Sequence, residues 1–366
     1  MILYVLLALL MLGILITVHE WGHFAAARLT GIPVREFAIG FGPGIAKWKS
    51  KKHETEFALR AIPAGGYCAF YGENSPDEKA DEDPRAMRGF PVWKRLIVVL
   101  AGPFMNFVLA FTVAFFFYWA SGIPTATEFG YMTVDSVTAG SAAEEAGLKI
   151  GDVIFSVNGE DAAGVAADGT TYRLIELTNR YQAGDAPLAL SVKRGEETLS
   201  LSVTPAYSQA EGRMLMGISI RPEVLKETVV RLTLPQAASY AFDLCVREGK
   251  AIAESLYQMI HTGQNLDQMS GTVGVIRIVA ETTRDYQLEG FLSLLVMISV
   301  NLGLVNLLPI PGLDGSQAVL LVIEAIRRKP LSRKVESYIT MAGFALLMTL
   351  FVVLTYQDIS NIIMGR

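Results

Sequence analysis

Long apolar runs separated by polar stretches dominate the pattern along the chain. Nearly uninterrupted apolar segments occur in four regions, which are 1–27, 96–121, 291–326 and 337–357. About 20 apolar residues allow a helix to cross a bilayer. The pattern therefore predicts a polytopic α-helical membrane protein with four transmembrane helices. The sequence PIPGLDG at 309–315 interrupts the third region, because its prolines and glycines break a helix.

The first apolar run has an alternative interpretation as a cleaved signal peptide, because the alanines at 25–27 resemble a cleavage site. Signal peptides begin with a basic segment. No lysine or arginine precedes this run, so we expect a retained span.

Short segments of alternating polar and apolar residues, typical of β-strands, fill part of the polar region after the second run. The stretch GSAAEEAGLKIGDVIFSVNG at 140–159 resembles the core of a PDZ domain. This resemblance implies an inserted α/β domain, a partly open β-barrel, over 127–206. A PDZ domain offers a sheet edge to which an extended peptide can add as a strand. A blocked groove or a spacer role is the alternative.

The remainder of this polar region, 207–290, is expected to be a linker. Apolar residues at helical spacing predict an amphipathic helix over 235–260, which lies on the outer membrane surface or simply packs in the core.

Lysines and arginines near the spans predict the orientation in the membrane. They concentrate in the loop 28–95 and again between 327 and 334. Because short cytoplasmic loops carry the excess of basic residues, both loops should be cytoplasmic. The segment 122–290 and both termini should then lie outside the cytoplasm.

The composition agrees with a membrane protein and argues against a nucleic-acid-binding or disulfide-rich protein. Hydrophobic residues make up 51% of the chain and charged residues only 18%, with a mean hydropathy of +0.37. A net charge of -5 gives no basic face for nucleic acid, so no nucleic-acid partner is expected. Cys68 and Cys245 lie far apart and outside any C-x-x-C pair, which argues against a disulfide framework.

The motif HEWGH at 19–23 places ionisable side chains on the first span. On a helix, His19 and His23 face the same way and can bind one metal ion, with Glu20 as the base that takes a proton from water. A helical cluster of satisfied polar groups is the alternative, but ionisable groups in a span are costly without partners and a task. Asp314, in the broken third region, is the expected third ligand.

Together with HEWGH, the motifs AGPFMN at 101–106 and NLLPIPGLDG at 306–315 resemble the site-2 protease family of intramembrane zinc metalloproteases. The resemblance implies that His19, His23 and Asp314 bind Zn²⁺ and that Glu20 is the general base. It implies that Asn306 orients the substrate or stabilises the oxyanion. It also implies that the segment 57–73 is a membrane-reentrant β-hairpin that pairs with an extended substrate through Gly65, Gly66 and Tyr67.

The same resemblance implies the partners and the compartment. Expected substrates are single-span membrane proteins already trimmed by an upstream site-1 protease, such as anti-sigma factors or signal-peptide remnants, cleaved within the lipid bilayer. The expected location is the bacterial inner membrane, with a possible peptide ligand for the PDZ domain. A non-enzymatic PDZ-bearing scaffold and a transporter are the alternatives.

Overall fold

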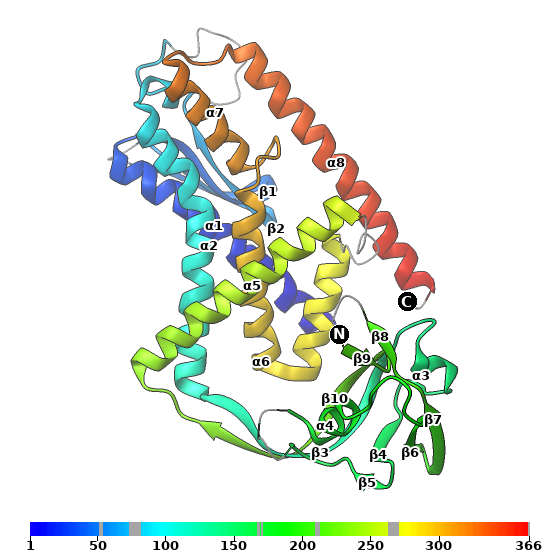
Figure 1. The fold of residues 1–366 in the computed structure, drawn as a ribbon. Helices are drawn as coiled ribbons and strands as arrows, with labels where there is room; N and C mark the ends of the chain where they lie inside the picture. The colour runs from blue at the N-terminus through cyan, green and yellow to red at the C-terminus, as the bar shows by residue number, and fades with distance from the viewer. Residues whose placement is uncertain are drawn as a thin grey trace. The chain divides into compact units, whose positions relative to one another are not determined.

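The computed structural model describes residues 1–50, 54–72, 82–166, 169, 171–208, 213–262 and 271–364 of the chain. These residues form two compact units (Figure 1). The first unit comprises Met1–Ala120 together with Leu232–Arg366, and the second is Ser121–Arg231.

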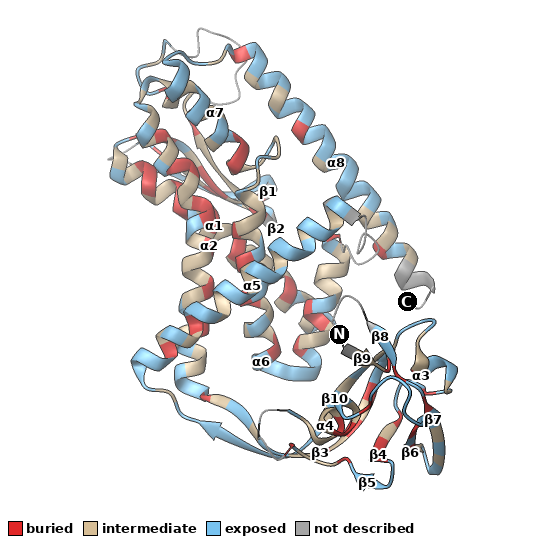
Figure 2. Cartoon of the chain, viewed as in Figure 1, coloured by how far each residue is buried: buried red, intermediate tan, exposed pale blue. Residues whose placement is uncertain are grey.

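Among the described residues of the first unit, four helices are long and apolar enough to cross a membrane. They are α1 (Ile2–Thr30), α2 (Val92–Ser121), α6 (Thr272–Asn306) and α8 (Arg333–Met364). Exposed residues run along much of α8, among them Phe344 and Phe351 (Figure 2). Large exposed apolar side chains on a long helix are what a lipid-facing surface requires. The four helices fit a polytopic helical membrane protein.

The third apolar region is organised differently from the single interrupted stretch expected over 291–326. Helix α6 already begins at Thr272, where charged residues hide the apolar pattern, and has a non-helical residue at Gln287 (φ 52°). It ends at Asn306, and a separate helix, α7 (Asp314–Arg327), follows. Prolines and Gly312, whose φ is +96°, keep the chain between them out of a helix.

A small sheet follows α1 in the chain. It is built from β1 (Val34–Lys49) and β2 (Glu56–Phe70), and the short 3-10 helix η2 (Met87–Gly89) leads on to α2. Residues 36–39 of β1 pair with 66–69 of β2 on one side and with 56–59 on the other. The segment 57–73 thus does not fold back on itself as a hairpin, because β1 lies between its two halves. Residue 73 lies outside the described residues.

Close helix packing fixes α1 against its neighbours. A Cβ at Gly22 would stand 2.3 Å from the Ala101 carbonyl oxygen, so only glycine permits this approach to α2. Farther along α1, Met11 and Leu15 are buried against Val279 and Leu295 of α6.

Helix α5 (Leu234–Thr262) follows the second unit and occupies the segment in which an amphipathic helix is expected. Its buried Ala241 packs with Ala110 of α2 and Val300 of α6. Near the other end of α6, the Asp358 carboxylate of α8 accepts hydrogen bonds from the backbone N–H groups of Gly271 (3.1 Å) and Gly274 (2.7 Å).

The second unit is a β-rich fold around its own core. Its sheet has the strand order β10-β3-β4-β6-β7, with β5 beside β4, and the core includes Met132, Ile154, Leu174 and Leu190. The elements are β3 (Ile123–Val137), α3 (Ala142–Glu145), β4 (Val153–Val157), β5 (Glu160–Asp161), α4 (Arg173–Asn179), β6 (Leu188–Arg194), β7 (Glu197–Val203), β8 (Ala206–Ser208), β9 (Arg213–Leu215) and β10 (Ile218–Val230).

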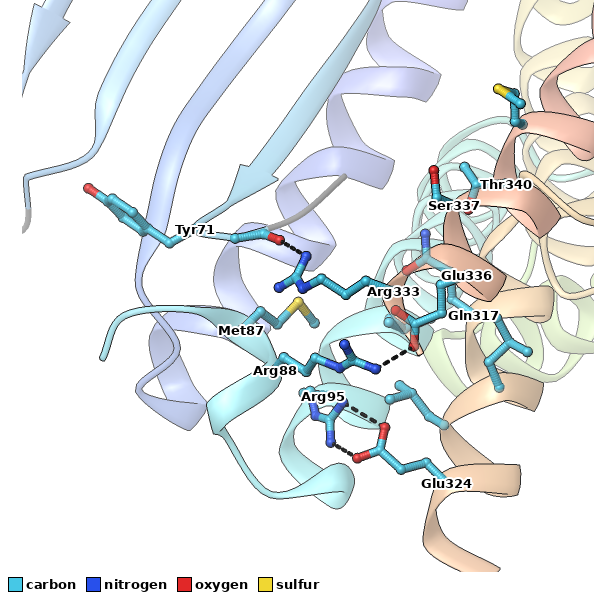
Figure 3. A pocket seen from close by; sticks show the side chains of 15 residues that line it. Tyr71, Met87, Arg88, Arg95, Gln317, Glu324, Arg333, Glu336, Ser337 and Thr340 are labelled. Atoms are coloured by element: carbon cyan, nitrogen blue, oxygen red, sulfur yellow. Dashed lines mark hydrogen bonds and ion pairs between the residues drawn. The ribbon is translucent and has the colours of Figure 1, made fainter. Parts of the chain in front are cut away.

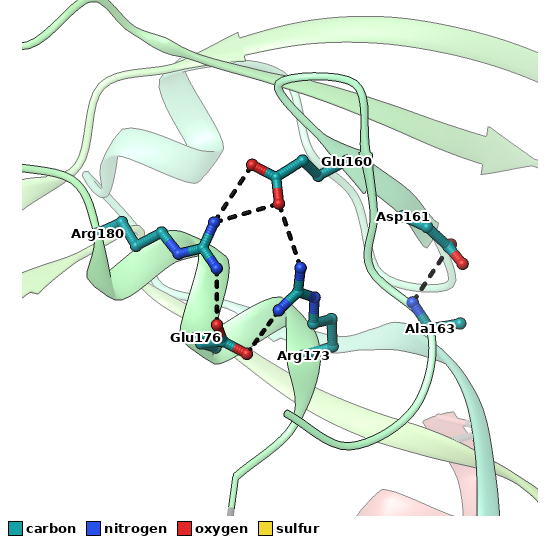
Figure 4. A network of polar contacts seen from close by, with 6 residues as sticks. All are labelled: Glu160, Asp161, Ala163, Arg173, Glu176 and Arg180. Carbon is teal, nitrogen blue, oxygen red and sulfur yellow. Dashed lines mark hydrogen bonds and ion pairs between the residues drawn. The ribbon is translucent and has the colours of Figure 1, made fainter. Parts of the chain in front are cut away.

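This unit extends past residue 206, where the sequence pattern placed its end. The reason is that β10 returns to pair along β3, from Ile218 with Val137 to Val230 with Ile123. On the surface, Glu160 of β5 contacts Arg180 at 3.1 Å and Arg173 at 3.2 Å, and Glu176 joins both arginines (Figure 4). These partly exposed ion pairs tie α4 to β5 and each contributes little stability.

Candidate active site

The two histidines of HEWGH lie one helical turn apart on α1 and face α2. Their Nε2 atoms are 3.2 Å apart, and the residues are only 7% and 8% exposed. Each imidazole has a partner for its other nitrogen, Nδ1. His23 donates its Nδ1–H to the Val98 carbonyl oxygen at 2.8 Å, which leaves the Nε2 lone pair available.

Asn106 of α2 plays the corresponding part for His19. Its buried side-chain nitrogen Nδ2 lies 3.1 Å from His19 Nδ1, and its Oδ1 has no hydrogen-bond partner among the described residues. Turned by 180° about its last side-chain bond, the amide would bring Oδ1 to this position, where it would accept the Nδ1–H of His19. His19 Nε2 then also presents a lone pair, so both histidines are prepared as metal ligands.

Asp314, the first residue of α7, completes this group from the far end of the chain. Its Oδ2 lies 3.0 Å from His19 Nε2 and 3.5 Å from His23 Nε2. Three electron-rich atoms this close would repel one another unless a cation or a proton lies between them. Zinc bonds of about 2.0–2.1 Å at tetrahedral angles place neighbouring ligand atoms about 3.3–3.4 Å apart, close to the observed separations. The three residues therefore fit a zinc ion.

Gly102 leaves room beside the imidazoles. A Cβ at this position would stand 2.3 Å from His23 Nε2 and 2.9 Å from His19 Nε2. The α2 backbone therefore approaches the ligand atoms at a distance that no side chain permits.

Glu20 lies next to the sheet formed by β1 and β2. A Cβ at Gly66 would be 3.6 Å from Glu20 Cγ, and the Glu20 carboxylate is hydrogen-bonded to the backbone N–H of Cys68. Among the described residues, 66–70 has a partner strand on one side only, so this segment is a sheet edge. Of the predicted substrate-pairing residues, Gly65 has a φ of +130° where the chain turns into this edge.

Tyr67, the third of the predicted substrate-pairing residues, is held by charged groups of the same sheet. Its hydroxyl donates to Glu36 Oε1 at 2.8 Å, and Arg60 contacts both side chains. The edge strand next to Glu20 is thereby tied to its neighbouring strand at Glu36 and to the strand beyond it at Arg60.

Asn306 is the half-buried last residue of α6. It does not belong to the group of described residues whose ligand atoms converge, which are His19, His23 and Asp314. Gly102 and Asn106 also lie at this site, although the sequence motifs predicted no role for either residue. A signal for them was available, because a glycine and an asparagine four residues apart share one face of an otherwise apolar span.

Comparison with known proteins places this site in a family. The family model for Peptidase family M50 matches residues 7–350. A protein of Synechocystis named as a zinc metalloprotease is 35% identical over 99% of this chain and 96% of its own length. The chloroplast membrane metalloprotease ARASP of Arabidopsis thaliana is 31% identical over 97% of this chain and 78% of its own. The regulator of sigma-W protease RasP of Bacillus subtilis is 29% identical over 97% of both chains.

The family match covers nearly the whole chain, including the segments that carry His19, Glu20, His23 and Asp314. It favours a protease over the scaffold and the transporter. The chain therefore belongs to Peptidase family M50, the site-2 protease family, and is a multi-pass membrane protein that acts as an intramembrane zinc metalloprotease.

Proposed function

We propose that His19, His23 and Asp314 hold the zinc ion and that Glu20 is the general base for hydrolysis of peptide bonds within transmembrane segments. The observation that carries the proposal is the convergence of three ligand atoms from opposite ends of the chain, 3.0, 3.2 and 3.5 Å apart. The Nδ1 partners of both histidines and the open space at Gly102 add support.

Zinc at this position supplies a Lewis acid that polarises the scissile carbonyl and makes water more acidic. Glu20 accepts a proton from the attacking water and passes it to the leaving amine nitrogen. His19 and His23 would hold the ion through Nε2, with Nδ1 turned to the Asn106 amide and to the Val98 carbonyl oxygen. Asn306, at the end of α6, is proposed to orient the substrate or to stabilise the oxyanion with its amide N–H.

We propose that the substrate binds as an added strand. A helical peptide bond is shielded by the turns around it and must be extended before it can be attacked. The edge strand at Gly66 and Tyr67, which pairs with 36–39 of β1, can add such an extended segment as a further strand. Its contact with Glu20 supports this assignment, with Gly65, Gly66 and Tyr67 beside the substrate backbone. The sheet would then enter the membrane from the cytoplasmic side.

The proposed substrates are single-span membrane proteins that an upstream site-1 protease has already trimmed, such as anti-sigma factors and signal-peptide remnants. Support comes from the Bacillus relative, whose name states that it is a regulator of sigma-W protease. The proposed location is the bacterial inner membrane, with both termini and the second unit outside the cytoplasm. We propose a PDZ domain in that unit, and β10 at the end of its strand order offers an edge for a peptide.

Three purified proteins test the chemistry against a single-span substrate in detergent: the parent, Glu20→Gln and Asp314→Ala. The parent should contain about one zinc ion per chain. Glu20→Gln should keep its zinc and lose cleavage by about 10²- to 10⁴-fold, because only the base is removed. Asp314→Ala should insert into the membrane and lose zinc. Full zinc retention would remove Asp314 from the ligand set, and unchanged cleavage would remove Glu20 as the base.

A further inference from the structure

A pocket of about 350 Å³ lies in the first unit, lined by residues of α2, α7 and α8 (Figure 3). Apolar side chains such as Val99 and Leu321 form part of its wall. Arg95 of α2 and Glu324 of α7 also line it and meet across it.

Arg95 and Glu324 form a bidentate ion pair. Arg95 donates from Nη1 to Glu324 Oε2 at 3.0 Å and from Nη2 to Oε1 at 2.5 Å. The two side chains are only 7% and 12% exposed. A buried pair gives little net stability over apolar residues of the same size, but its fork geometry fixes distance and orientation. Its effect is therefore expected on the position of α7.

Among the described residues of α7, the printed ion pairs with other helices are made by two carboxylates, Asp314 and Glu324. Asp314, Gln317, Leu321 and Glu324 follow at spacings of three, four and three residues, so they lie within one stripe of the helix. The remaining surface carries exposed apolar side chains, including Val322 and Ile326. Glu324 lies about 15 Å along the helix from Asp314, so the two carboxylates are polar contacts near opposite ends.

The partner helix α2 also positions the histidines, through the Val98 carbonyl, Gly102 and Asn106. We propose that the Arg95–Glu324 pair is a positioning element of the metal site, which sets α7 on α2 so that the Asp314 carboxylate meets both imidazoles. This inference rests on the proposed ligand set. It assigns no contact with zinc or substrate to either residue.

The same pocket offers a matched control. Arg88, at η2, forms a second ion pair with Glu336 of α8 at 3.3 Å, and both residues line the pocket. This pair joins η2 to α8. Its removal should therefore leave Asp314 in place.

The test compares full-length proteins in detergent: Arg95→Met/Glu324→Leu, Glu324→Asp, Arg88→Met/Glu336→Leu and Asp314→Ala. Zinc release to an excess of chelator and the visible absorption spectrum after Co²⁺ substitution are measured, because both report the metal's surroundings without cleavage. Both Glu324 variants should release zinc at least about 10-fold faster and change the Co²⁺ spectrum, as expected when a ligand loses its support. The Arg88/Glu336 variant should match the parent.

The outcomes separate the two proposals. Zinc retained by Asp314→Ala would overturn the ligand set itself. Zinc lost from that variant, with parent-like release and spectrum in either Glu324 variant, would overturn only the positioning role. Equally fast release from the Arg88/Glu336 variant would also overturn it, because the effect would then belong to the whole pocket. Glu324→Asp keeps the charge and shortens the side chain by one methylene, so its result decides if the double variant does not fold.

Discussion

The close approach of the α2 backbone at Gly102 to the imidazoles predicts a large effect of one added methyl group. In Gly102→Ala the new Cβ would stand 2.3 Å from His23 Nε2, whereas ordinary contacts begin near 3.4 Å. The Cβ–Nε2 distance is about 1 Å too short for an ordinary contact. The His23 ring must therefore move back by about 1 Å, or α2 must move away by as much. Metal–ligand distances hold to within about 0.2 Å, so a shift of this size breaks a ligand bond.

The expected loss can be separated from a loss of folding. Disturbing a residue that supports a metal ligand typically weakens metal binding by about 10- to 100-fold. Because this change displaces a ligand itself, we expect at least about 100-fold weaker zinc binding, or roughly 2.8 kcal/mol. Alanine favours a helix over glycine by about 1 kcal/mol, so α2 should not be destabilised by its backbone.

Zinc content of the purified variant, measured over a series of buffered free zinc concentrations, gives the affinity, and cleavage of a single-span substrate is followed in the same samples. Gly89→Ala is the matched control, because a Cβ there would meet nothing within 4 Å. It should bind zinc as the parent does. Parent-like zinc affinity in Gly102→Ala would show that the imidazoles do not face α2 at the stated distances, and the reasoning would be refuted.

The sequence pointed to the residues proposed as ligands because each carries a local signal. His19 and His23 are four residues apart, which places both on one face of a helix. Asp314 is an ionisable residue in an apolar run, and such residues are costly unless they have partners. Residues that support the ligands carry weaker signals. The role of Asn106 depends on which face of α2 meets α1, and that is decided by tertiary packing around Gly22 and Ala101.

Long-range pairing accounts for other features that the pattern did not reveal. The insertion of β1 between the two halves of β2 joins segments whose pairing no local periodicity specifies. The same holds for β10, which extends the second unit beyond residue 206. Arg95 has a clear sequence interpretation as one of the basic residues that orient the spans. Only the fold brings it to Glu324, on a helix that the sequence merged into the third span.

Two further predictions concern partners inside each unit. Asn106→Leu removes the side-chain amide that faces His19 Nδ1 and should weaken zinc binding by about 10- to 100-fold in the same titration, whereas unchanged affinity would mean that another group orients His19. In the second unit, burial raises the pKa of the Asp152 carboxyl, but hydrogen bonds from Arg194, both at 2.8 Å, outweigh it and hold the pKa below its usual value. Because the folded pKa lies below the unfolded one, the stabilisation is complete above about pH 4 to 5 and is lost as the pH falls through the folded pKa. Hydrogen-exchange protection of β4 and β6 in the whole protein, corrected for intrinsic rates, should therefore fall on acidification below pH 5 in the parent. Asp152→Asn should already have lost about 1.5–3 kcal/mol of protection at pH 7 and respond less to acid. The same protection and the same acid response in both proteins would show that the pair of buried Asp152 and partly exposed Arg194 does not stabilise the unit.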